Sequence, residues 1–420
     1  MSKLFISRQP SGIFDGELQK LNVYEELGVK PIINADGPVT RLSGSVMSPE
    51  VVKAIVEASK FHVDMEQLQA RASKIIAEVT GAEAGIVTTG ASAGLSLATA
   101  ACVAGFDIAK MEKLPNTSGM KNEVVMIRSH RNPYDHAIRL VGVTLVEVGL
   151  DESATGVGVR KPETWEIESA INENTAAIAY LAKSWNSPAL NEVSKVAKKR
   201  DVPVIVDAAA ELPPVSNLRA FIRDGADLVA YSGGKAIGGP QSSGILCGKK
   251  DLIMSAAAQM LDSDCRFETW NPPQDFIDKS RFRSIPRQGI GRGFKAGKEE
   301  IVGLLTALRI FSSRKNEEES LETMKSIARF VAESFQGSGS LSAKYVEPSN
   351  ENRLPSAEIT VKNPRGPQFM YELILRLKAA DPPVYFNETF LDRMLLLVNP
   401  STLSMGQAEH LVRTLKTFVP

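Results

Sequence analysis

Short β-branched and apolar runs alternate with helix-like stretches through the middle of the chain. Strands alternating with helices are typical of a mostly parallel sheet covered by helices on both faces. Such sheets bind ligands beyond the carboxyl ends of their strands. The predicted strands are Gly85–Thr88, Val124–Ile127, Val143–Val148, Ala176–Leu181, Val202–Val206, Leu228–Tyr231 and Ser243–Leu246. The predicted helices between them are Ala93–Ala104, Pro133–Leu140, Glu163–Asn172, Leu190–Arg200 and Ser216–Asp224.

The two ends of the chain follow other patterns. The first 45 residues are rich in Gly, Pro and Ser around a short helix-like piece, Leu18–Leu27, and a helix then opens at Ser48-Pro49-Glu50. Long helices are predicted from residue 299 to residue 335, ahead of the Gly/Ser-rich stretch Gly337–Ser342. The last elements are strand Ala357–Val361, helix Gln368–Leu377, strands Val384–Phe386 and Met394–Val398, and helix Met405–Thr417. We therefore predict an N-terminal arm and helix at 1–60, a large domain at 61–310 and a small α+β domain at 311–420.

Composition narrows the classes of function. The chain has 420 residues, of which 43% are hydrophobic, enough for more than one folding unit. Lys+Arg and Asp+Glu both total 49, so charge gives no argument for nucleic acid or an anionic membrane as partner. Three widely spaced cysteines and four histidines form no metal-ligand pattern, so no metal site is expected. Without a signal-like or membrane-spanning apolar run, we expect a cytoplasmic protein.

Two charged residues follow neighbouring predicted strands. Asp207 comes directly after Val202–Val206, and Lys235 follows Leu228–Tyr231 within a run of small residues and glycines. Pyridoxal 5′-phosphate (PLP) needs an amine for its Schiff base and an acid partner for its pyridine nitrogen. Lys235 would supply the amine and then act as acid and base, and Asp207 would keep the nitrogen protonated. The alternative is a turn-capping Asp and a structural Lys, but their pairing at successive strand ends favours PLP.

A third segment suits an anion. Residues 87–93 join a strand to an alanine-rich helix and contain Gly90, Ala91 and Ser92. Free N–H groups and the helix dipole favour a phosphate at such a helix start. Ser232, three residues before the lysine, could reach the same phosphate. The alternative is that Ser92 simply caps the helix.

Further polar residues are candidates for the ring and the substrate. His130, which follows Val124–Ile127, could stack on the cofactor ring, unless its polar neighbours form only a solvated loop. Arg292 lies in a cation-dense stretch before a helix, where it either binds an anion or belongs to a solvated helix entry. Arg41 could pair with a substrate carboxylate through two parallel hydrogen bonds. Trp185 lies in a stretch, 182–188, where substrate could sit.

With these residues in hand, the chain resembles the SelA-like branch of fold type I PLP enzymes, in particular the D-glucosaminate-6-phosphate ammonia-lyase type. The resemblance implies the aspartate aminotransferase-like fold, with a mostly parallel seven-stranded sheet and a small C-terminal α+β domain. It also implies that Ala209 lies under the ring, that Gln241 and Arg292 could act across a subunit interface, and that the protein is a homodimer or higher oligomer. The motifs that carry the resemblance are Ile33-Asn34-Ala35, Thr40–Ser45, Thr89–Ala93, His130-Arg131-Asn132, Asp207-Ala208-Ala209, Ser232–Lys235, Gly238–Gln241 and Gly297–Glu300.

The leading hypothesis is a PLP-dependent lyase that eliminates water from a β-hydroxy amino acid and releases a 2-oxo acid and ammonia, with D-glucosaminate 6-phosphate as one candidate substrate. Selenium transfer on seryl-tRNA is an alternative, although it needs a basic surface that the zero net charge does not favour. Aldolase or racemase activity is another, because each begins by breaking a bond at Cα. A catalytically inactive binding subunit is disfavoured because Lys235 and Asp207 are both present.

Overall fold

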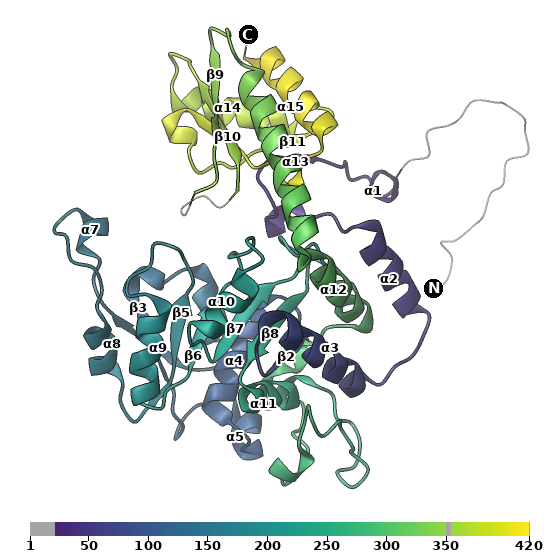
Figure 1. The fold of residues 1–420 in the computed structure, drawn as a ribbon, viewed down its shortest axis with the longest axis vertical. Helices are drawn as coiled ribbons and strands as arrows, with labels where there is room; N and C mark the ends of the chain where they lie inside the picture. Colours follow the sequence, from purple (N-terminus) through teal and green to yellow (C-terminus); the bar gives the residue numbers. More distant parts are fainter. Residues whose placement is uncertain (1–21, 350–353, 420) are drawn as a thin grey trace, which may run out of the picture.

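The computed structural model describes residues 22–349 and 354–419, and its centre is one seven-stranded sheet (Figure 1). The strand order is β2-β8-β7-β6-β5-β3-β4, and only β8 runs opposite to the others. The predicted mostly parallel, seven-stranded sheet is therefore confirmed. The strands are β2 (Ala84–Thr88), β3 (Glu123–Ile127), β4 (Thr144–Val148), β5 (Thr175–Leu181), β6 (Val204–Asp207), β7 (Leu228–Ser232) and β8 (Gly244–Gly248).

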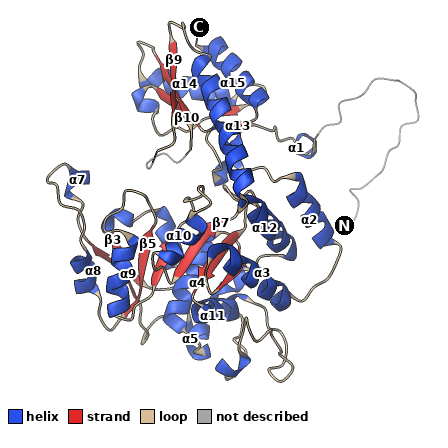
Figure 2. Cartoon of the chain, in the orientation of Figure 1, coloured by secondary structure: helices blue, strands red, loops and turns tan. Residues whose placement is uncertain are grey.

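Helices cover both faces of this sheet, as Figure 2 shows. Successive strand residues point to opposite faces: Val124 and Met126 join one apolar core, whereas Val125 and Ile127 join the other. The first core includes the helices α4 (Ala91–Ala104), α5 (Ile108–Lys113), α6 (His136–Arg139) and α11 (Lys250–Met260). The second includes α2 (Pro49–Ser59), α3 (Met65–Thr80), α8 (Thr164–Ala170), α9 (Leu190–Lys199), α10 (Asn217–Arg223) and α12 (Lys298–Phe311).

A second, three-stranded antiparallel sheet has the order β12-β10-β9. Its apolar core lies against α13 (Arg314–Glu333), α14 (Pro367–Lys378) and α15 (Met405–Phe418), and α13 extends from this unit toward the large sheet (Figure 1). Strands β10 (Ser356–Val361) and β12 (Leu395–Val398) were predicted, but β9 (Leu341–Val346) begins inside the Gly/Ser-rich stretch and was missed. The long helices predicted from residue 299 to residue 335 are α12 and α13, which are separated at Ser312 and Ser313.

The N-terminal segment connects to the C-terminal part of the chain. Strand β1 (Ile33–Asn34) pairs in parallel with β11 (Val384–Tyr385), and α2 then packs on α12. The expected helix Leu18–Leu27 lies partly outside the described residues, and its described part is α1 (Val23–Glu26). The expected helix Pro133–Leu140 is a 3-10 turn, η3 (Pro133–Asp135), followed by the short α6. The division of the chain at residues 60 and 310 stays a prediction.

Residues 22–349 and 354–419 contain neither a membrane-spanning helix nor a cluster of metal-ligating side chains. No helix there combines the length and the apolar character that crossing a membrane requires. Nor do His, Cys, Asp and Glu side chains of this part gather into a group that could hold a metal ion.

Candidate active site

Asp207 and Lys235 lie at the same edge of the large sheet. Asp207 is the last residue of β6 and pairs with Ala230 of β7, and the Ala208 N–H donates to the Ala230 carbonyl at 3.0 Å. Lys235 lies three residues beyond the end of β7. The loop after β7, which carries Lys235, is tight, because a Cβ on Gly234 would lie 2.4 Å from the Gln241 Cα. Glycine is therefore required where the lysine loop approaches the chain at residue 241.

The Asp207 carboxyl group is nearly enclosed. Its Oδ1 accepts a hydrogen bond from the Ala209 N–H at 3.0 Å, and no other donor in the described part of the chain reaches the side chain. Burial raises the pKa of this carboxyl group, while the Ala209 N–H and the charges of Lys235 and Lys183 lower it. A protonated ring nitrogen fits here because Oδ2 is available to accept its N–H.

The Lys235 amine is half-buried and has no hydrogen-bond or ion-pair partner among residues 22–349 and 354–419. Burial lowers its pKa, which the nearby Asp207 carboxylate partly offsets. A lowered pKa raises the fraction of neutral amine, the form that attacks an aldehyde. The amine and the carboxyl group therefore fit the two ends of PLP that the sequence analysis assigned to them.

The start of α4 offers free backbone donors. Its first flanking residue, Gly90, has φ = +90°, and no side chain caps the helix. Ser92 is exposed in the first turn and does not cap it, so that alternative is wrong. The first N–H groups of a helix lack partners within the helix, so those after Gly90 can receive an anion. Strand β8 passes close by: a Cβ on Gly244 would lie 2.3 Å from the Gly90 carbonyl carbon, and Ser232 is the β7 partner of Gly244.

The N-terminal segment lies over the lysine loop. Ser45 donates its N–H to the Gly234 carbonyl at 3.0 Å and its hydroxyl to the Lys235 carbonyl at 2.8 Å. The Gln241 side chain donates to the Thr40 carbonyl at 2.7 Å. Two candidate substrate residues, Gln241 and the neighbour of Thr40, Arg41, are therefore brought to the lysine loop by the fold.

Arg41 is already engaged within the chain. Its Nη2 lies 2.7 Å from the buried Asp36 carboxylate and 4.0 Å from Glu388, which belongs to the C-terminal part. Asp36 also accepts from Asn387 at 2.9 Å. These contacts connect Arg41 to the C-terminal part of the chain. Its pairing with a substrate carboxylate stays a prediction.

His130 is fully buried. Its Nδ1 accepts from the Leu181 N–H at 3.4 Å, its ring meets Tyr180 edge-on with centroids 4.7 Å apart, and Nε2 has no partner in the described chain. Burial lowers the His130 pKa to about 4, so the ring is neutral near pH 7. Stacking on the cofactor ring stays a prediction.

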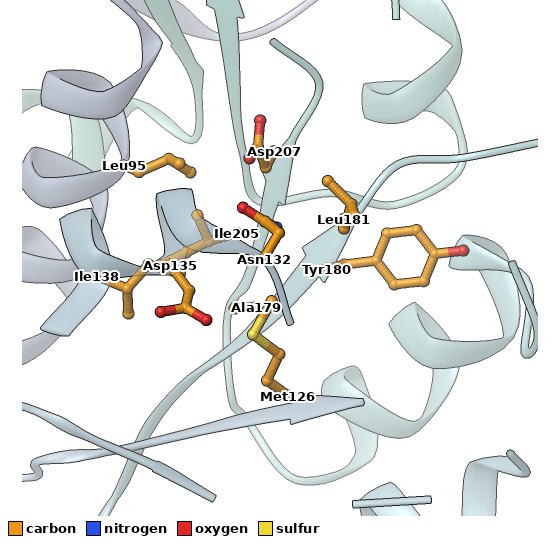
Figure 3. A pocket seen from close by; sticks show the side chains of 10 residues that line it. All are labelled: Leu95, Met126, Asn132, Asp135, Ile138, Ala179, Tyr180, Leu181, Ile205 and Asp207. Carbon is orange, nitrogen blue, oxygen red and sulfur yellow. The ribbon is translucent and has the colours of Figure 1, made fainter. Parts of the chain in front are cut away.

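A small pocket of about 10 Å³ lies beside Asp207 (Figure 3). Asn132, Asp135 and Tyr180 line it together with Asp207, and His130 does not. The pocket is bounded by the ends of β3, β5 and β6. Two of its polar lining residues, Asn132 and Asp135, belong to the loop that carries His130.

The two remaining candidate substrate residues are Arg292 and Trp185. Arg292, in η5 (Ile290–Phe294), is held by Asp262 at 2.6 and 3.0 Å, so its charge is paired within the chain. Its segment nevertheless contacts the residues before α4, because the Thr89 N–H donates to the Phe294 carbonyl at 3.2 Å. Trp185 is exposed and lies 5.8 Å from the Lys183 amine. Substrate contact by Arg292 and by Trp185 stays a prediction.

A second charged pair, which was not predicted from the sequence, lies at this edge of the sheet. Lys183 follows β5, and its amine lies 2.7 Å from the buried carboxylate of Glu211, four residues after Asp207. Both side chains affect the pKa values of Asp207 and Lys235. A lysine within three residues of the end of a buried strand is the same signal that identified Lys235, so the sequence held a clue to Lys183.

The chain is similar to known proteins over most of its length. The model of the family described as SelA, L-seryl-tRNA selenium transferase, matches residues 32–268. A D-glucosaminate-6-phosphate ammonia lyase from Salmonella typhimurium is 38% identical over 68% of this chain and 69% of its own. A 5′-C-glycyluridine monooxygenase-decarboxylase from a Streptomyces species is 32% identical over 94% of this chain and 92% of its own.

A solved structure of D-glucosaminate-6-phosphate ammonia-lyase superposes with a TM-score of 0.76 at 30% identity, covering 96% of this chain and 99% of the other. The family and its fold are PLP-dependent. The resemblance noted from the sequence motifs is thus confirmed. The chain belongs to the SelA family of PLP-dependent enzymes with the type I fold.

Proposed function

We propose that the protein is a PLP-dependent lyase that converts a β-hydroxy α-amino acid into a 2-oxo acid and ammonia. One observation carries the proposal: an unpartnered Lys235 amine and an Asp207 carboxyl group with one available oxygen lie at neighbouring strand ends. In this assignment Lys235 holds the cofactor, Asp207 holds a proton on its ring nitrogen, and the start of α4 with Ser232 binds its phosphate. Ala209 and His130 then flank the ring.

PLP, when bound, withdraws electrons from the substrate's α-carbon and so weakens the bonds to that atom. Lys235 then takes the proton from Cα, and the hydroxyl on Cβ leaves as water. The resulting enamine gains a proton on Cβ and becomes an imine, and water hydrolyses this imine to the 2-oxo acid and ammonia.

The names of similar proteins support this substrate class. A seryl group and D-glucosaminate both carry a hydroxyl group on the carbon next to the α-amino carbon. D-Glucosaminate 6-phosphate is one candidate substrate, and Arg41, Gln241, Trp185 and Arg292 are the proposed substrate contacts.

A second candidate is oxidative decarboxylation of such an amino acid. The similarity to the monooxygenase-decarboxylase supports it, because that similarity extends over 94% of this chain. The two reactions break different bonds at Cα: elimination breaks Cα–H, and decarboxylation breaks the bond to the carboxylate.

The test is a screen of D- and L-β-hydroxy amino acids, with and without a 6-phosphate, and of seryl-tRNA. Ammonia and 2-oxo acid formed without oxygen uptake support the lyase. Carbon dioxide release with oxygen uptake supports the second candidate, and turnover of seryl-tRNA alone contradicts both. Wild type should also gain a visible absorbance band with PLP that Lys235→Ala loses, and no band in wild type would exclude a PLP enzyme.

We also propose a homodimer or a higher homo-oligomer. Four large apolar side chains of the N-terminal part are exposed and support it: Val46, Val52, Val56 and Phe61. Val46 directly follows Ser45, which contacts the lysine loop. The burial of exposed apolar surface in an interface is a main driving force for association. Light scattering of the purified protein tests it, and a monomer at all concentrations would contradict it.

A further inference from the structure

Lys183 and Glu211 form an ion pair that the proposed chemistry has not yet used. Leu181, the last residue of β5, pairs with Asp207, and the Ala182 N–H donates to the Asp207 carbonyl at 2.9 Å. Lys183 is the next residue, so it leaves the sheet beside Asp207. Since β5 and β7 flank β6, Lys183 and Lys235 approach Asp207 from opposite sides.

The ion pair fixes where the Lys183 amine lies. The Glu211 side chain is only 5% exposed, and its carboxylate lies 2.7 Å from the Lys183 amine. The Glu211 backbone is held as well, by its N–H to the Ala208 carbonyl at 3.1 Å and by Asn217 to its own carbonyl at 2.7 Å. The ion pair therefore holds the Lys183 amine in one place.

The amine retains capacity for another partner. A lysine ammonium has three N–H donors, and the carboxylate of Glu211 is the one hydrogen-bond acceptor that Lys183 Nζ meets in the described chain. The side chain is a quarter exposed, so water can reach it, while the Trp185 ring lies 5.8 Å away. The charge of Lys183 also lowers the pKa values of Lys235 and Asp207.

Two amines in one site can divide the work of an elimination. One must accept the Cα proton, which suits a neutral amine, and the other must donate a proton to the departing oxygen, which suits an ammonium. Lys235 has no carboxylate partner within hydrogen-bonding distance, whereas Lys183 has Glu211. The unpaired Lys235 therefore suits the role of proton acceptor, and the ion-paired Lys183 suits the role of proton donor.

We propose that Lys183, held by Glu211, is the acid that protonates the β-hydroxyl group as it leaves. This inference rests on the proposed lyase function. Lys235 Nζ takes the Cα proton, the electron pair of the Cα–H bond forms the Cα–Cβ double bond, and the Cβ–O bond breaks. Lys183 Nζ gives its proton to that oxygen, which departs as water, and then regains a proton from solvent.

The test compares leaving groups. A chloride leaves without a proton, so a β-chloro amino acid bypasses the acid, whereas a hydroxyl group does not. Wild type and Lys183→Met are assayed with serine and 3-chloroalanine of the same configuration, and with the β-hydroxy amino acid that wild type converts fastest. We expect Lys183→Met to lose about 100-fold or more with the hydroxy substrates, in the range of a lost general acid, and about threefold or less with 3-chloroalanine.

A second variant separates proton donation from charge. Lys183→Arg keeps the positive charge and can pair with Glu211, but arginine does not give up its proton. We expect it to fail with hydroxy substrates as Lys183→Met does. Recovery of activity in Lys183→Arg would overturn the proposal in favour of an electrostatic role.

Lys249→Met is the matched control. Lys249 also pairs with a buried carboxylate, Asp227, at 2.7 Å, but this pair lies at the opposite end of β7. We expect this variant to treat both leaving groups as wild type does. Both Lys183 variants should also keep the PLP absorbance band, since they leave Lys235 intact.

Four further outcomes overturn the proposal. Equal loss with both leaving groups in Lys183→Met, or no loss with either, excludes the acid. Loss of the PLP band assigns Lys183 to cofactor binding instead. If wild type converts no β-hydroxy amino acid, the proposed function fails and this inference fails with it, whereas the other outcomes leave the lyase function intact.

Discussion

His130 makes the stability of the protein depend on pH in a way that can be calculated. The ring is fully buried, and a proton on it would leave a charge with no acceptor for Nε2 among the described residues. Burial lowers the pKa from an ordinary 6.5 to about 4 in the folded state. Between these values the unfolded chain binds a proton at this residue that the folded protein does not bind.

The sign and the size of the pH effect on stability follow from this difference in pKa. The contribution of His130 is fully present above about pH 6.5, is lost as the pH falls toward 4, and is constant below that. One pKa unit corresponds to about 1.4 kcal/mol, so the free energy of unfolding should fall by about 3 kcal/mol from this residue alone. Other titratable groups also make the free energy of unfolding depend on pH. Comparing wild type with a variant at residue 130 removes their contribution, because both proteins share these groups.

The assay is urea unfolding of the PLP-free protein at a series of pH values from about 7 to 4, for wild type and His130→Asn. An asparagine carbonyl can accept the Leu181 N–H in place of Nδ1, but it does not titrate. We expect the variant to be less stable near pH 7 and to lose stability less steeply as the pH falls. The control is His136→Asn, because His136 is exposed six residues away. Parallel curves for wild type and His130→Asn would refute the reasoning.

Two further predictions concern the cofactor site. Asp207→Asn should retain PLP but lose about 100-fold or more in turnover, because it removes the charge that keeps the ring nitrogen protonated; an undiminished rate would contradict that role. Gly244→Ala should weaken PLP binding by about tenfold or more in a fluorescence titration, since its Cβ would lie 2.3 Å from backbone at Gly90 and shift the start of α4, the proposed phosphate site. Gly293→Ala is the control because a Cβ there meets nothing within 4 Å, and equal affinities in the two variants would count against a phosphate site at the start of α4.

Local patterns were sufficient for the large sheet. Each of its strands is a short apolar run with neighbours that break it, and the alternation of faces at Val124, Val125 and Met126 follows from strand geometry alone. The hydrophobic patterns failed to predict strands that are very short or that pair with a segment far away in the sequence. Strand β9 begins in a glycine- and serine-rich stretch, and β1 has only two residues, whose partner β11 lies some 350 positions along the chain.

The same distinction applies to the site. The sequence by itself determined that Asp207 and Lys235 follow neighbouring strand ends, because the carboxyl ends of parallel strands lie at one edge of a sheet. Only the tertiary structure decided which charges are compensated: Arg41 by Asp36, Arg292 by Asp262 and Lys183 by Glu211. The physical reason is that strand ends follow from local periodicity, whereas the partner of a long charged side chain depends on how distant loops pack against each other.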